Sequence, residues 1–125
     1  MKEYPKFSSL TGKTLTDVKG AVGGDEITFI LTDGETHRLF HRQDCCESVS
    51  INDIIGDLKD LVGSPILLAE EVSSQDNPAG VPIPKYQGAG CFTWTFYRIQ
   101  TAKGLVTIRW YGESNGYYSE WVNFE

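Results

Sequence analysis

The sequence predicts a mostly β protein of the α+β class, with a single curved antiparallel sheet of about six or seven strands and one short helical insertion. Short segments rich in β-branched and aromatic residues recur along the chain. Turn-forming pairs such as Asp33-Gly34 and Lys103-Gly104 separate these segments. Apolar residues with the spacing of a helix occur in residues 50–61. A chain of 125 residues, 40% of them hydrophobic, suits one domain with its own core.

The first half of the chain predicts an arm followed by strands. We expect residues 1–12 to be an N-terminal arm and residues 13–125 to be a single β-rich domain. The strands expected before the helical insertion are residues 14–19, 26–32 and 35–42. A two-residue type I′ turn at Asp33-Gly34 would place Phe29 opposite Arg38.

The helical insertion is expected to begin at Ser50, a good N-cap residue. Its apolar positions with helical spacing are Ile51, Ile54, Ile55, Leu58 and Leu61. Strands are then expected at residues 65–73, 91–102, 105–112 and 117–124. The last three would form a meander, and residues 74–90 would form a long loop stiffened by proline.

Charge and cysteine content narrow the classes of protein. Seventeen acidic and eleven basic side chains give a net charge of −6, which argues against nonspecific binding of duplex nucleic acid. No apolar run is long enough for a membrane span, and residues 1–10 do not resemble a signal peptide. Three cysteines leave one unpaired, and the adjacent Cys45 and Cys46 do not bridge easily, so a reducing cytoplasm is expected.

Two segments, residues 44–49 and 108–120, carry more polar and aromatic groups than folding requires. A two-residue turn at Lys103-Gly104 would place one set of side chains in the core: Tyr97, Ile99, Val106, Ile108 and Trp110. The opposite face would carry Trp94, Phe96, Arg98, Thr107, Arg109 and Tyr111. Such an aromatic and cationic face suits a purine or a phosphate-bearing ligand, but also a subunit interface or ordinary sheet packing.

The candidate ligand-binding residues are Trp94, Phe96, Arg98, Arg109, Tyr111, Ser114, Asn115, Tyr117 and Ser119. The aromatic rings would stack on a base, the arginines would meet phosphates, and the serine and asparagine groups would bind ribose hydroxyls. Tyr86, in the long loop, is the candidate lid residue.

No catalytic motif, cofactor motif or metal site is expected from the sequence. Cys45 and Cys46 match no zinc-ligand spacing and are expected to be buried free thiols where a strand meets the helix. Gly23-Gly24 lacks the helix and lysine of a phosphate-binding loop. The expected function is therefore binding and not catalysis.

Several motifs in combination resemble one protein family. They are Asp44-Cys45-Cys46-Glu47-Ser48-Val49, Thr93-Trp94-Thr95-Phe96-Tyr97 and the run from Arg109-Trp110-Tyr111 to Ser114-Asn115-Gly116-Tyr117-Tyr118-Ser119. The chain resembles a family of small uncharacterised proteins of tailed phages and prophages. The resemblance implies a phage accessory protein that acts in the cytoplasm of the infected bacterial host, and it implies no particular activity.

By analogy with small phage proteins that counter host defences, we expect a homo-oligomer that binds and sequesters a small nucleotide-derived immune signal without catalysis. The alternative is a protein–protein inhibitor of a host defence enzyme, which the acidic net charge favours. An enzyme that cleaves the same kind of signal is a third possibility.

Overall fold

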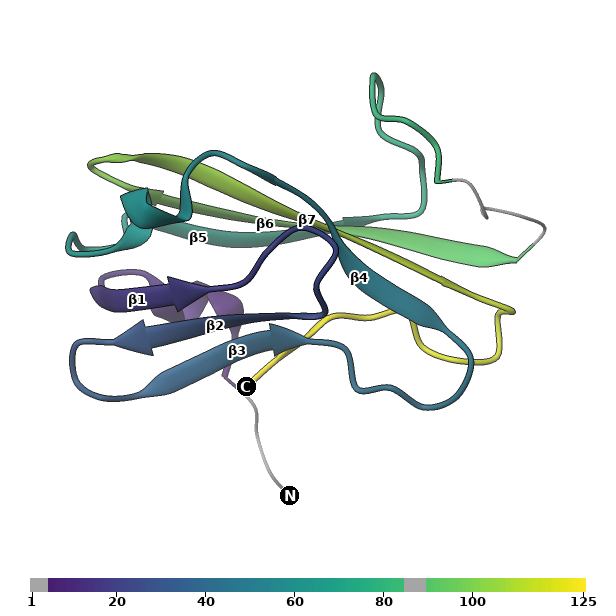
Figure 1. The fold of residues 1–125 in the computed structure, drawn as a ribbon, viewed down its shortest axis with the longest axis horizontal. Coiled ribbons are helices and arrows are strands. Elements are labelled where there is room, and N and C mark those ends of the chain that lie inside the picture. Colours follow the sequence, from purple (N-terminus) through teal and green to yellow (C-terminus); the bar gives the residue numbers. More distant parts are fainter. Residues whose placement is uncertain (1–4, 85–89) are drawn as a thin grey trace.

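In the computed structural model, described over residues 5–84 and 90–125, two four-stranded antiparallel sheets pack face to face as two layers (Figure 1). The first sheet has the order β1 (Leu15–Lys19), β2 (Glu26–Leu31), β3 (Thr36–Phe40), β8 (Asn123–Phe124). The second sheet has the order β4 (Ser48–Ile55), β7 (Gly104–Ser114), β6 (Cys91–Thr101), β5 (Leu68–Ser74). Two short 3₁₀ helices are η1 (Phe7–Leu10) and η2 (Leu58–Leu61).

The expected single curved sheet with a helical insertion is therefore wrong, and residues 48–55 form β4 instead of a helix. The cause lies in a β-bulge, because the pairing of β4 with β7 shifts register between Ile51 and Asp53. The bulge moves the strand's alternation by one residue, so Ile51 and Ile54 both pack on the core. This i, i+3 spacing is what made the segment resemble a helix.

The expected meander is also wrong in its third strand. β8 pairs with β3 in the first sheet and not with β7. The physical reason is that β4 and β6 already occupy both sides of β7, so no edge remains for another strand. After Ser114 the chain therefore crosses from the second sheet to the first.

The two hairpins deviate from their expected registers in different ways. In the β2–β3 hairpin Thr28 lies opposite Arg38, one residue away from the expected pairing, because Gly34 (φ 92°) completes a three-residue loop. The shift brings Leu39 into the core cluster. Phe40 lies outside that cluster and is buried instead beneath the Arg38 guanidinium, 3.9 Å from the ring centroid. In the β6–β7 hairpin the observed pairing differs from the expected pairing by two residues. Because this is an even number, every side chain stays on its expected face of the sheet. The predicted core face of this hairpin is confirmed.

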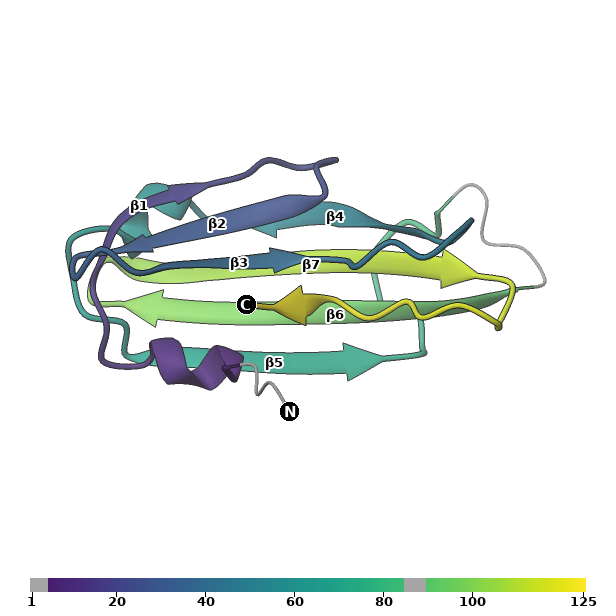
Figure 2. The ribbon, with the colours of Figure 1, turned by 90° about the horizontal axis from the view of Figure 1, so that it is seen from below.

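The sides of the sandwich are closed differently. On one side, the turn after β1 bonds to the edge of β4 through Gly23 N–H to Ile51 O and Ile51 N–H to Gly24 O, both 2.8 Å. On the other side, η1 lies along β5 (Figure 2) and inserts Phe7 against Tyr97, with ring centroids 4.8 Å apart. Residues 7–10, part of the expected arm, thus contribute to the core.

No helix in the described part of the chain is long and apolar enough to cross a membrane.

Candidate functional site

The two motif-rich segments, far apart in the sequence, meet around one cavity of about 300 Å³. Its walls are residues 46–48, residues 90–92, Tyr111, residues 113–115 and Tyr118. Strand order explains the meeting: β4 and β6 begin at the end of the sheet where β7 finishes, and Glu113 of β7 lies opposite both Ser48 and Phe92. We call this space the motif cavity.

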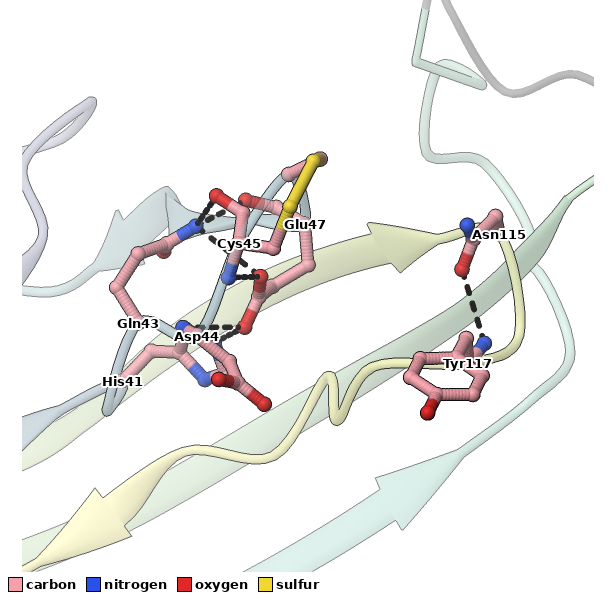
Figure 3. The surroundings of a disulfide bond; sticks show 8 residues. His41, Gln43, Asp44, Cys45, Glu47, Asn115 and Tyr117 are labelled. Carbon is pink, nitrogen blue, oxygen red and sulfur yellow. Dashed lines mark hydrogen bonds and ion pairs between the residues drawn. A yellow bond between two sulfur atoms is a disulfide. The ribbon is translucent and has the colours of Figure 1, made fainter.

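The loop before β4 is folded around the Glu47 carboxylate (Figure 3). The Cys45 backbone N–H donates to Oε1 at 2.8 Å, and the Asp44 N–H donates to Oε2 at 3.0 Å. His41 Nε2 lies 2.8 Å from Oε2, while its Nδ1 lies 2.7 Å from the Trp121 carbonyl oxygen. Burial alone would raise the pKa of Glu47, but these hydrogen bonds lower the pKa to about 2. An ionised carboxylate therefore organises one wall of the motif cavity.

The cysteines differ from expectation. Cys45 and Cys46 are exposed and joined by a disulfide, so the prediction of buried free thiols is wrong in the structure. The reason is local: no helix follows them, and the tight loop turns the Glu47 side chain inward and the two sulfur-bearing residues outward. Cys91 is a free, exposed thiol, and both it and Cys46 line the motif cavity.

Alkylation of the native protein with iodoacetamide should modify one cysteine, Cys91, because only that residue carries an exposed free thiol. After reduction with a dithiol, all three cysteines of the chain should be modified. Mass spectrometry of peptides reads both states. Modification of Cys45 and Cys46 without reductant would contradict the disulfide.

Three of the predicted ligand-binding residues, Tyr111, Ser114 and Asn115, line the motif cavity. Trp94 packs beside Tyr111, with ring centroids 4.6 Å apart, but it is fully buried. Its indole N–H donates to Asn77 Oδ1 at 3.1 Å, so part of the 74–90 loop covers it. The candidate lid residue Tyr86 lies outside the described residues.

The predicted phosphate-binding arginines lie on the same outer face of the second sheet, but away from the cavity and beside acidic groups. Arg109 donates to Asn52 Oδ1 at 2.8 Å and lies 3.5 Å from Asp53 Oδ2. Arg98 lies 3.3 Å from Glu70. Their assignment as phosphate ligands stays a prediction.

The remaining predicted residues do not line the motif cavity. Phe96 is half-buried beside Arg109 on the outer face of the sheet. Tyr117 is 83% exposed, and the exposed Ser119 accepts a hydrogen bond from the Trp121 N–H at 3.2 Å. Tyr118, the neighbour of Tyr117, lines the cavity, and the two tyrosine rings contact each other edge to face with centroids 5.0 Å apart.

Sequence reasoning missed several lining residues: Glu47, Ser48, Phe92, Glu113 and Tyr118. Glu47, Ser48, Glu113 and Tyr118 belong to the two segments that the sequence distinguishes, residues 44–49 and 108–120, so their chemistry was visible. Phe92 lies outside both segments, and its place at the cavity follows from the order of the strands, which no local pattern contains. Within residues 5–84 and 90–125, no group of three or more histidine, cysteine or acidic side chains is arranged to hold a metal ion.

Fold and site together define a small β-sandwich protein with a cavity at one end of its second sheet. Residues 8–124 match a domain family of unknown function, DUF7448, and the chain belongs to this family. All of the residues that line the motif cavity lie within the matched range. No curated protein and no solved structure shows significant similarity to the chain.

Proposed function

We propose that the protein binds and retains a small nucleotide-derived ligand in the motif cavity without changing it chemically. The observation that carries this proposal is that residues 46–48 meet Tyr111, residues 113–115 and Tyr118 around one cavity. Its volume of about 300 Å³ lies at the lower end of the range for ligand pockets and suits one nucleoside-sized unit.

The chemistry of the lining supports a ligand with both an aromatic ring and hydroxyl groups. Phe92 and Tyr111 form a stacked pair with ring centroids 6.2 Å apart, and Tyr118 adds a third ring to the walls. The Tyr111 hydroxyl donates to Glu113 Oε2 at 3.0 Å, and the carboxylate can also accept from ribose hydroxyls. The Ser114 hydroxyl donates to Glu120 Oε2 and accepts from the Gly116 N–H at 3.0 Å, which leaves it one acceptor position for a ligand.

A phosphate on such a ligand would have to extend beyond the cavity, because none of the lining residues in the described part of the chain is basic. Arg109 lies two residues from Tyr111 on the same strand and face, about 7 Å along β7. This guanidinium is within reach of a phosphate that replaces Asp53 as its anionic partner. Arg98, opposite Thr107, lies a further two residues along the sheet.

The biological role that we propose is that of a phage accessory protein that sequesters an immune signal in the cytoplasm of an infected bacterium. The resemblance to small phage proteins supports it, and sequestration requires only a binding site. We further propose a homo-oligomer. Its support is a set of exposed apolar side chains on the outer face of the second sheet, from Ile55, Leu68, Val72 and Leu105.

Tyr118 and Tyr117 form a matched pair for testing the site. Replacement of Tyr118 with alanine should weaken ligand retention by about tenfold to a hundredfold, the usual loss when an aromatic platform is removed from a base. Native mass spectrometry of protein purified from bacteria that express a nucleotide-signal-producing defence system measures the retained mass. Tyr117→Ala should retain the ligand as the unaltered protein does, because Tyr117 does not line the cavity.

Absence of any retained small molecule in the unaltered protein would contradict the proposal. The second candidate is a protein–protein inhibitor, which the strongly exposed Tyr117 and Trp121 favour, since aromatic residues dominate interface hot spots. In that case the same experiment would show a host protein in the complex, and Tyr117→Ala would weaken the complex more than Tyr118→Ala.

A further inference from the structure

His41 lies buried between the two chain segments that supply opposite ends of the motif-cavity lining. Its side chain is 3% exposed, and that of Glu47, which belongs to the wall formed by residues 46–48, is 0% exposed. The ring contacts Glu47 Oε2 through Nε2 at 2.8 Å (Figure 3). Through Nδ1 it contacts the carbonyl oxygen of Trp121 at 2.7 Å, and Trp121 follows the wall residue Tyr118 by three positions. His41 therefore joins two walls of the cavity without contributing its own side chain to the lining.

The segment after β7, residues 115–122, lies directly against that strand. At Gly112 of β7, an added Cβ would lie only 2.9 Å from the carbonyl oxygen of Glu120, which is closer than Cβ atoms approach such an oxygen. The missing side chain at Gly112 therefore permits the approach of the segment. The hydrogen bond from His41 to Trp121 then ties the same segment to the loop before β4.

Hydrogen-bond chemistry determines how many protons the His41 ring carries. A main-chain carbonyl oxygen only accepts, so Nδ1 must donate to Trp121. The ionised Glu47 carboxylate already accepts from the backbone N–H groups of Asp44 and Cys45, so Nε2 must donate to it as well. A neutral imidazole has one N–H group, whereas an imidazolium has two. Only the imidazolium form of His41 satisfies both contacts.

The charges around His41 favour a buried imidazolium. Glu47, from the loop before β4, is its ion-pair partner, and a buried carboxylate without a cation would be costly. The other charged groups of the neighbouring segments are exposed or bound elsewhere: Asp44 is exposed, Arg42 pairs with Glu125, Glu113 accepts from Tyr111, and Glu120 accepts from Thr93 and Ser114. Within residues 5–84 and 90–125, Glu47 is thus the one acidic group in an ion pair with His41.

We propose that His41 is a positioning residue of the motif cavity, which holds the two wall segments together only while its ring carries both protons. The effect on ligand binding rests on the proposed function, whereas the link between the walls does not. When the ring loses a proton, one of its two contacts loses its donor, and a buried oxygen is left without that partner. The assembled cavity is therefore favoured at lower pH, and the walls loosen as the pH rises through the titration of His41.

A different placement of the shared proton competes with this proposal. The same distances would arise if Glu47 were protonated and donated its hydroxyl to a neutral His41 ring. The N–H donors of Asp44 and Cys45 oppose this arrangement, because they stabilise the charged carboxylate. The two arrangements differ in one observable: Nε2 of His41 carries a proton in the first and none in the second.

Nitrogen NMR of the imidazole rings tests the protonation state in the unaltered protein. Both ring nitrogens of His41 should carry protons at neutral pH, and a single protonated nitrogen would overturn the proposal. Loss of the His41 proton at higher pH should shift the amide resonances of residues 44–45 and of Tyr118 together, and independent shifts of the two walls would also overturn it. His37, the second histidine of the chain, is the internal control, because its ring contacts Glu35 and neither wall.

Adenosine serves as the probe of the motif cavity, and its affinity should fall by about tenfold across the same pH range. His41→Gln should bind adenosine weakly without this pH dependence, whereas His37→Gln should keep the pH profile of the unaltered protein. Equal affinity on both sides of the His41 titration would overturn the positioning role. If adenosine binds at no pH, the result counts against the proposed function, and the joint shift of the two walls still decides the role of His41.

Discussion

Replacement of Trp110 with alanine is expected to lower the free energy of unfolding by about 3–5 kcal/mol. Trp110 is 0% exposed and points from β7 into the core between the two sheets. The substitution loses the free energy of burying the apolar side chain. It also leaves a cavity, because the closely packed sheets on both sides cannot move to fill it. Since domains of this size are stable by only about 5–15 kcal/mol, urea unfolding should show a large shift of the midpoint.

Trp121→Ala is the matched control, because this tryptophan is 56% exposed. Its contact with His41 uses the backbone carbonyl, which the substitution retains. The change should alter the free energy of unfolding by no more than about 0.5 kcal/mol. A similar loss for both tryptophan variants would contradict the division between core and surface.

The β6–β7 hairpin shows what can be predicted from local pattern. Residues that alternate along two long strands share a face in any register that differs by an even number of residues. The buried set that includes Tyr97 and Trp110 was therefore predicted although the pairing itself was off by two. In the β2–β3 hairpin the error was one residue. The expected pairing of Phe29 with Arg38 would have put Phe40 on the core face, whereas the structure puts Leu39 there.

The division into two sheets could not be predicted from local pattern because it depends on contacts between distant segments. The bulge at Asn52 disguised a strand as a helix. Pairing of Asn123–Phe124 with β3 depends on which strand edges remain free after the other strands have paired. Neither feature leaves a signal in a short window of sequence.

The candidate site was predicted only in part, because it too depends on contacts between segments that are distant in the sequence. Tyr111, Ser114 and Asn115 belong to a segment whose composition exceeds the needs of folding, and the structure places them at the motif cavity. Ser48 and Phe92 reach the cavity only because β4 and β6 flank β7. Trp94 was predicted to contact the ligand, but in the structure it is fully buried. The segment that contains Asn77 covers it, and the sequence does not define the path of that segment.

The folded protein is expected to lose stability as the pH falls from about 4.5 to about 2, and Glu47 should account for a large part of the loss. The lowered pKa of Glu47 in the folded state means that the unfolded chain binds the proton first. Its contribution to stability is therefore complete above its ordinary pKa of 4.5 and disappears as the pH passes about 2. Urea unfolding at a series of pH values in this range measures the slope.

Glu47→Gln isolates this contribution, because the amide keeps the shape of the side chain but cannot ionise. The variant should lose stability less steeply in acid because it cannot ionise. It should also be less stable at neutral pH, because its NH₂ group replaces one of the two acceptor oxygens and so faces the N–H donor of either Cys45 or Asp44. Glu125, whose pKa is lowered by Arg42 and Arg38, should retain its own acid dependence in the variant. Glu35→Gln makes the same substitution at an exposed carboxylate outside this loop and serves as the control. An acid slope in Glu47→Gln as steep as in the unaltered protein would show that the loop before β4 is not held by this carboxylate.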